Sequence, residues 1–174
     1  MEFPYPVPAG PRIEAPRIHG KTVADQAFRD PRNGREYIYR LFSGSLDPDK
    51  ISTLVLALTP EKMVVYIHQY RHGAHGYIYE IPGGNGPSPE ETAKNELLEE
   101  TGYQAGEMLR LSPSPLWFEP AASEGMFWAY LALDCRKVAE PKPDEYEYLA
   151  AVYALGGQDW LALIASGVVR DSKS

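Results

Sequence analysis

The sequence predicts an α/β (α+β) fold in which helices pack on a mixed sheet. Short apolar segments with strand character lie on both sides of a mid-chain helix, and an amphipathic helix closes the chain. The length of 174 residues suits one domain with a sizeable core, and the apolar fraction of 44% is ordinary for a globular protein. No internal repeat interrupts this pattern.

The chain begins with a proline-rich segment. Five prolines lie among the first 16 residues, so we expect residues 1–19 to form an extended arm without a core of its own. Residues 20–174 are expected to form the folded domain.

Strands are expected where apolar residues alternate between turn signals. Asn33-Gly34 is a hairpin signal because both residues tolerate positive φ, and residues 59–62 are expected to join two antiparallel strands. The expected strands are residues 37–42, 52–58, 63–68, 77–81, 126–133 and 148–155.

Two helices are expected, over residues 89–101 and 158–165. Ser88 is a suitable N-cap, Pro89 fits the first helical position, and Glu91 could complete a capping box. Gly102 follows the last turn of the first helix, and Gly167 ends the second.

Composition excludes several classes of protein. The single cysteine, Cys135, cannot form an internal disulfide and suits a reducing cytosol. Neither a signal-peptide pattern nor a long apolar run is present, so we expect a cytoplasmic protein without a membrane partner. The net charge of −7 argues against binding nucleic acid. It does not argue against a nucleotide substrate, because acidic sites bind phosphates through metal ions.

Three glutamates of the first helix, Glu96, Glu99 and Glu100, have the spacing i, i+3, i+4 that places carboxylates on one helix face. Like charges at this spacing repel each other unless water or a cation separates them. Oxygen ligands grouped in this way suit Mg²⁺ or Mn²⁺. For carboxylates considered alone, a solvated acidic face is the commoner arrangement, whereas the Gly-rich turn directly before the helix favours a cation site. Both interpretations stay open at this point.

Residues 80–103, EIPGGNGPSPEETAKNELLEETGY, resemble the Nudix box, G-x5-E-x7-R-E-U-x-E-E-x-G-U, where U is apolar. Residues 96–103 match its second half, and residues 86–91 resemble its middle as found in ADP-ribose pyrophosphatases. The same branch has an E-L-P-A-G run like residues 80–84, a Q-Y-R run like residues 69–71 and a closing helix like residues 164–173. The resemblance covers roughly residues 20–172.

Two residues depart from the box. Pro87 stands at its first glutamate and Asn95 at its arginine, and the turn between Gly84 and Gly86 is shorter than the pattern. In the family these two residues serve largely as a structural ion pair. Losing both members of a pair costs far less than losing one, so we expect the metal-binding face to be kept.

The resemblance implies a Nudix α/β/α sandwich with an N-terminal β extension. It also implies a homodimer with exchanged N-terminal strands, in which residues 20–50 lie in the contact. The implied metal ion is Mg²⁺ (or Mn²⁺), and its implied ligands are Glu96, Glu99, Glu100 and the Gly83 carbonyl.

The implied reaction is hydrolysis of the pyrophosphate bond of ADP-ribose, a UDP-sugar or a GDP-sugar. Glu99 and Glu100 would take part in catalysis, and Glu124 or Glu119 would activate the water; Glu124 is preferred because it lies directly before a strand. The implied substrate-binding residues are Arg71, Glu80 and Gly84. A surface salt bridge is the alternative for Arg71. The alternative for the whole protein is a weak or inactive Nudix domain that binds a nucleotide sugar or a protein.

Overall fold

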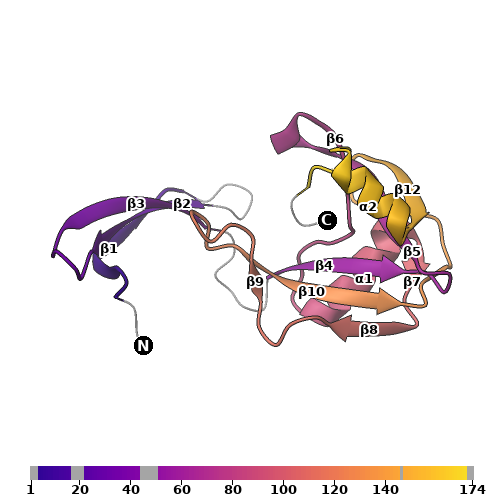
Figure 1. Cartoon of the computed structure of the whole chain (residues 1–174), viewed down its shortest axis with the longest axis horizontal. Helices are drawn as coiled ribbons and strands as arrows, with labels where there is room; N and C mark the ends of the chain where they lie inside the picture. Colours follow the sequence, from indigo (N-terminus) through magenta and orange to yellow (C-terminus); the bar gives the residue numbers. More distant parts are fainter. Residues whose placement is uncertain (1–3, 17–21, 44–50, 146, 172–174) are drawn as a thin grey trace. The chain divides into compact units, whose positions relative to one another are not determined.

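The computed structural model describes residues 4–16, 22–43, 51–145 and 147–171. The chain divides into two compact units (Figure 1). The first comprises Met1–Pro48 and Trp117–Met126, and the second comprises Asp49–Leu116 and Phe127–Ser174. The domain boundary expected after residue 19 lies outside the described residues.

The first unit is built on an antiparallel sheet in the order β1-β2-β3, with β1 at Val7–Glu14, β2 at Thr22–Arg29 and β3 at Glu36–Ser43. The turn between β2 and β3 closes where the Gly34 N–H donates to the Asp30 carbonyl at 2.8 Å. Of the two residues of the hairpin signal, only Gly34 adopts positive φ, at 72°.

Strand β1 lies inside the proline-rich arm. It pairs with β2 from Val7↔Arg29 to Glu14↔Ala24, with a register shift between Pro8 and Arg12. Proline has no N–H for a ladder and is therefore tolerated on an edge strand or at a bulge, and β1 is an edge strand. Within the arm, strand β1 is extended, has no buried residue and shares a sheet with β2.

The segment Trp117–Met126 also belongs to the first unit, where it is bonded to β3. The Phe42 N–H donates to the Ala122 carbonyl at 2.8 Å, and the Glu124 N–H donates to the Phe42 carbonyl at 2.8 Å. The Tyr39 hydroxyl donates to the Ala121 carbonyl at 2.7 Å. The loop is thus an extension of the N-terminal sheet.

The second unit has a mixed sheet in the order β12-β5-β4-β10-β8, with β6 paired to β5. Strands β4 and β5 form the predicted antiparallel hairpin, and β10 runs parallel to β4. The strands are β4 (Ser52–Leu58), β5 (Met63–Arg71), β6 (Gly76–Glu80), β8 (Glu107–Arg110), β9 (Leu116–Trp117), β10 (Met126–Leu133) and β12 (Leu149–Gly156). A separate pair joins β7 (Tyr103–Gln104) to β11 (Arg136–Lys137), and the 3-10 turn η2 spans His72–Ala74.

Strands β4 and β5 pair at Ala57↔Val65 and Leu58↔Val64. Towards the start of β4, the chain that follows β6 takes the place beside it. The Val55 N–H donates to the Pro82 carbonyl at 2.9 Å, and the Thr53 N–H donates to the Gly84 carbonyl at 2.8 Å. The segment that leads into the mid-chain helix is therefore bonded into the sheet.

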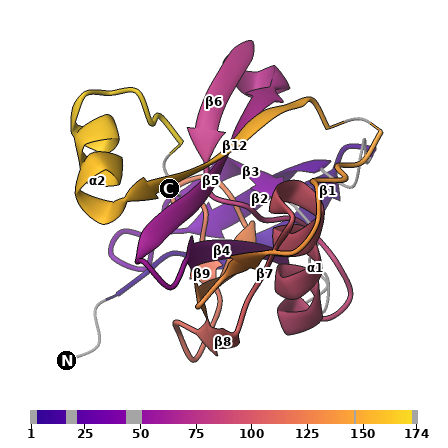
Figure 2. The ribbon, with the colours of Figure 1, turned by 90° about the vertical axis from the view of Figure 1, so that its right-hand side faces the viewer.

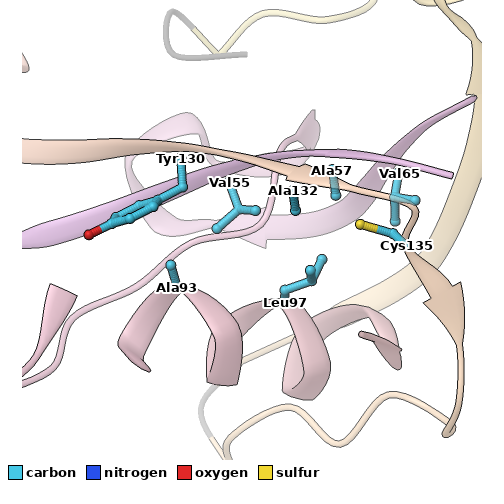
Figure 3. Close-up of a cluster of buried hydrophobic side chains, with 8 residues drawn as sticks. All are labelled: Val55, Ala57, Val65, Ala93, Leu97, Tyr130, Ala132 and Cys135. Atoms are coloured by element: carbon cyan, nitrogen blue, oxygen red, sulfur yellow. The ribbon is translucent and has the colours of Figure 1, made fainter. Parts of the chain in front are cut away.

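Helix α1 (Pro89–Thr101) and helix α2 (Gly157–Ala165) cover opposite faces of this sheet (Figure 2). Ala93 and Leu97 of α1 pack against Val55 and Val65 in the buried core (Figure 3). The Trp160 ring of α2 lies 4.7 Å from the ring of Tyr66. Tyr66 follows Val65 along β5 and so points to the other face. No helix of the described residues has the length and apolarity to cross a bilayer.

The bounds of α1 agree with the prediction, but its capping box is not formed. Ser88 has the extended backbone of an N-cap, yet its side chain makes no cap hydrogen bond. Glu91 instead accepts a bond from Lys94 Nζ at 3.0 Å, so its carboxylate is drawn along the helix. At the other end Gly102, with φ of 75°, donates its N–H to the Leu98 carbonyl as expected.

Candidate functional site

Helix α1 places its three glutamates at different depths. Glu100 is buried, with 1% of its surface exposed, Glu96 is half-buried and Glu99 is exposed. The difference follows from helical geometry, because Leu97 faces the core and Glu100 follows it by nearly one turn. Of the three carboxylates at this spacing, that of Glu100 is therefore buried, that of Glu96 is half-buried and that of Glu99 is in solvent.

The Glu100 carboxylate is only half satisfied. Its Oε2 accepts a hydrogen bond from the Gly83 N–H at 2.8 Å, while its buried Oε1 has no hydrogen-bond partner. Burial raises the pKa of Glu100 to about 8, with smaller upward contributions from the charges of Glu96 and Glu147. The Gly83 bond and the positive charge of Arg71 oppose this shift without cancelling it.

The Glu96 carboxylate lies directly over Gly84. A β-carbon on residue 84 would overlap the Glu96 carboxyl group, so a larger residue at this position would have to push that side chain aside. The pKa of Glu96 is raised to about 7, mainly by burial. The negative charges of Glu147, Glu99 and Asp144 also raise this pKa, whereas the positive charge of Arg71 lowers it.

The loop between β6 and α1 carries the Gly83 carbonyl, which is the predicted main-chain ligand of the metal ion. The carbonyls of Pro82 and Gly84 accept bonds from β4, whereas among the described residues no donor is bonded to the Gly83 carbonyl. The Gly83 N–H is meanwhile held by Glu100. The predicted ligand carbonyl is thus next to the buried carboxylate and has no bond to the sheet.

Arg71 and Glu80 form an ion pair beside the same carboxylates. Arg71 Nε lies 2.6 Å from Glu80 Oε1, and Glu80 is buried with 2% of its surface exposed. Arg71 also lowers the pKa of both Glu96 and Glu100. The guanidinium is therefore partly exposed at the margin of an acidic cluster.

Two acidic residues that the sequence analysis missed belong to this cluster. Asp144 and Glu147 lie before β12, and the Asp144 N–H donates to Glu147 Oε2 at 3.0 Å. Their charges raise the pKa of Glu96, and that of Glu147 also raises the pKa of Glu100. These acids lie just before the expected strand 148–155, but the pairing of that strand with β5 was not predicted.

The predicted loop glutamates, Glu119 and Glu124, lie in the first unit. Arg12 donates from Nη1 to Glu124 Oε1 at 2.7 Å and from Nη2 to Glu124 Oε2 at 2.6 Å. The same guanidinium donates to Glu14 at 2.9 Å, and these bonds raise the pKa of Arg12. Glu119 is exposed. Glu124 therefore anchors the loop to β1 in this conformation.

A NUDIX domain family model matches residues 48–163 of the chain. The chain belongs to the Nudix family. Its curated relatives include the ADP-ribose pyrophosphatase of Bacillus subtilis (strain 168), 30% identical over 123 residues, which are 69% of this chain and 65% of the relative. Another is the methanol dehydrogenase activator of Bacillus methanolicus, 44% identical over 57 residues, or 31% of each chain. The chain thus matches less than two thirds of the length of these relatives.

Among solved structures, a crystal structure of an ADP compounds hydrolase superposes with a TM-score of 0.75 at 19% identity. The match covers 95% of this chain and 85% of the other. Together with the mixed sheet and its two helices, this similarity confirms the predicted Nudix fold. The predicted resemblance to the ADP-ribose pyrophosphatase branch is also confirmed.

The two departures from the Nudix box lie on the outer surface. Pro87 and Asn95 are exposed, and Asn95 lines a shallow cleft of about 500 Å³ together with Lys94 and Leu98. Asn95 is about 140° around the helix axis from Glu100 at roughly 100° per residue. Asn95 therefore does not lie beside Glu100 on the helix surface.

The carboxylates of this Nudix site do not by themselves form a complete ligand set. Within the described parts of the chain, no three His, Cys, Asp or Glu side chains converge as a metal site requires. The donors that do fit a hard cation are the unpartnered buried Oε1 of Glu100 and the neighbouring Gly83 carbonyl. Both are oxygens without a hydrogen-bond donor.

Proposed function

We propose that the protein is a divalent-cation-dependent hydrolase of the pyrophosphate bond in ADP-ribose or a related nucleoside diphosphate sugar. The observation that carries the proposal is the buried Glu100 carboxylate, which has one oxygen without a partner next to the Gly83 carbonyl. An unsatisfied buried carboxylate is costly, and a cation at this position would remove the cost. The names of the relatives supply the substrate class.

Glu96, Glu100 and the Gly83 carbonyl would hold Mg²⁺ or Mn²⁺, and exposed Glu99 would add charge at the open side. When bound, such a cation neutralises charge on the pyrophosphate and acidifies a water molecule. Gly84 keeps the Glu96 carboxylate close to the loop, because it has no side chain to displace it. The chain would thus confine two carboxylates that otherwise repel each other.

Arg71 would bind a phosphate or ribose oxygen of the substrate. Its guanidinium is oriented by buried Glu80 through the 2.6 Å bond at Nε, which leaves donors on its terminal nitrogens. An arginine aligned in this way suits bidentate contact with phosphate oxygens. Glu80 is accordingly the residue that positions Arg71.

The water would be oriented by a carboxylate outside helix α1. Glu147 is a candidate because its charge acts on both Glu96 and Glu100 and its turn is fixed by the Asp144 N–H. Glu119 and Glu124 remain candidates from the sequence, although Glu124 is bonded through both oxygens to Arg12. With ADP-ribose the products would be AMP and ribose 5-phosphate.

A panel of ADP-ribose, UDP-sugars and GDP-sugars with Mg²⁺ or Mn²⁺ tests the proposal. We expect cation-dependent release of a nucleoside monophosphate, separated by chromatography, and its loss in Glu100→Gln. Turnover that survives EDTA would contradict the role of the cation. Tight substrate binding without products would support instead a domain that only binds its ligand.

We also propose that the protein is a homodimer that uses its N-terminal sheet. Ile13 and Ile38 are 68% and 73% exposed, and Phe42 is 55% exposed. Strand register places these side chains on one sheet face, because their β2 partners are Asp25, Ala27 and Val23. An exposed apolar sheet face favours contact with another protein surface.

A further inference from the structure

Four buried side-chain atoms among the described residues of the second unit have no hydrogen-bond partner, namely Gln69 Oε1, Glu100 Oε1, Trp128 Nε1 and Tyr130 Oη. One of them, Gln69 Oε1, lies on the strand that carries Arg71. Gln69 is 2% exposed, and its side-chain oxygen has no hydrogen-bond partner. The same is true of Glu100 Oε1. Buried polar groups are nearly always paired, and an orphaned one costs a substantial desolvation penalty. Of the four atoms, the amide oxygen of Gln69 and the carboxylate oxygen of ionised Glu100 can only accept, whereas the Trp128 N–H donates and the Tyr130 hydroxyl can do both.

Both acceptors lie between the sheet and helix α1. Along β5, Val65 packs with Leu97 of α1, and Arg71 acts on Glu96 and Glu100. Gln69 lies between Val65 and Arg71 at the two-residue period of a strand, so its side chain is on the same face. Opposite Gln69 stand Ile78 of β6 and Leu149 of β12, which offer no polar side chain.

Both oxygens can serve as ligands of a hard cation. An amide oxygen and a carboxylate oxygen are both hard ligands of the kind that Mg²⁺ and Mn²⁺ accept. Since no three acidic, His or Cys side chains converge among the described residues, neutral oxygens must complete any ligand set at Glu100. The Gly83 carbonyl is one such oxygen.

We propose that Gln69 supplies a side-chain oxygen to the cation site of Glu100 and Gly83, an inference that rests on the proposed function. A neutral ligand suits this position because the charges of Glu96 and Glu147 already act on Glu100. A carboxylate there would add to their repulsion whenever the cation is absent. Gln69 would thereby raise the number of ligands without raising the charge.

Mn²⁺ binding to the full-length protein without nucleotide tests the proposal, with free Mn²⁺ counted by electron paramagnetic resonance. Gln69→Leu removes the oxygen and should weaken Mn²⁺ binding by about 10-fold or more, in line with the loss of a supporting residue at a metal site. Gln69→Glu keeps an oxygen and adds charge, and should bind Mn²⁺ at least as tightly as the wild type. Thermal unfolding without cation shows that each variant is folded.

Gln26→Leu is the matched control. Gln26 is also buried, but its Nε2 donates to the Gly10 and Ala27 carbonyls in the first unit. This variant should bind Mn²⁺ like the wild type, which separates the loss of a ligand from the loss of any buried glutamine.

Wild-type Mn²⁺ affinity in Gln69→Leu would overturn the proposal. If Gln69→Leu does not fold, Gln69→Glu decides. Weaker Mn²⁺ binding in Gln69→Glu than in the wild type would mean that the amide donates to Glu100, and would also overturn it. A wild-type protein that binds no Mn²⁺ would contradict the proposed function itself, whereas a cation-dependent enzyme unaffected by Gln69→Leu would contradict this inference alone.

Discussion

The carboxyl group of Glu96 lies against the α-carbon of Gly84, in space that a β-carbon at residue 84 would occupy. The contact lies between the middle of α1 and the loop that leads into the helix, and the absence of a side chain at residue 84 leaves room for the carboxylate there. A methyl group at residue 84 would therefore push the carboxylate of Glu96 away from that of Glu100.

Gly84→Ala should lower turnover by about 100-fold, because a displacement of about 1 Å at a reacting group has an effect of that size. Gly73→Ala is the control, since a β-carbon at residue 73 has nothing within 4 Å. Steady-state kinetics at saturating Mg²⁺ measures the difference. Equal turnover in both variants would show that Glu96 need not keep its present position.

Glu100→Gln should make stability less dependent on pH when no cation is present. The pKa values of Glu100 and Glu96, about 8 and about 7, lie above the ordinary value of 4.5. The folded protein therefore keeps protons that the unfolded chain releases, and its stability falls as pH rises from about 4.5 to about 8. Removing Glu100 removes the larger part of this fall.

Urea unfolding in EDTA at a series of pH values from 5 to 9, on the order of one unit apart, measures this slope. Glu91→Gln is the matched control, because Glu91 is exposed on the same helix and its charge acts on neither Glu96 nor Glu100. Adding Mg²⁺ should flatten the wild-type profile by stabilising the charged carboxylates. An unchanged slope in Glu100→Gln would refute the assignment of the titration to this residue.

Glu147→Gln should reduce turnover more than Glu124→Gln. Both oxygens of Glu124 are bonded to Arg12, while the charge of Glu147 acts on Glu96 and Glu100. Glu124→Gln should instead lower the free energy of unfolding, by about 1–2 kcal/mol for a charge-assisted pair at a partly exposed position. Turnover rates and denaturant midpoints of the two variants decide, and the opposite ranking in turnover would restore Glu124 as the base.

Light scattering of the wild type should give about twice the chain mass of 19.4 kDa if the N-terminal sheet is the dimer contact. Ile38→Asp should shift the protein towards the single-chain mass, because it buries a charge in an apolar contact. Val138→Asp, at a residue 57% exposed in the second unit, should not. A wild type of 19.4 kDa at micromolar concentration would contradict the homodimer.

The features predicted from the sequence are those with local causes. Helix α1 was located by Pro89 and Gly102, whose backbone preferences act on their own turns. Strands β4 and β10 were located by their apolar runs. Strand β2 was missed because its buried positions include Thr22 and Gln26, which satisfy their polar groups through the main chain of β1 and its neighbours.

The features that were not predicted depend on contacts between distant segments. The attachment of residues 117–126 to β3 joins Phe42 to Ala122, which lie far apart in the sequence. No local sequence pattern predicts this contact. The different depths of Glu96, Glu99 and Glu100 depend on where α1 meets the sheet. The contribution of Glu147 depends on the antiparallel pairing of β12 with β5.

The bonding of Pro82 and Gly84 to Val55 and Thr53 makes the ligand-bearing loop a part of the sheet. Opening this side of the site would require breaking sheet hydrogen bonds, so substrate entry and product release must use other segments. The amide hydrogens of Val55 and Thr53 should accordingly exchange with solvent as slowly as the other hydrogen-bonded amide hydrogens of the central strands. The rate of cation release would then depend on how fast the protein oxygens dissociate from the ion. The loop itself would not move during release.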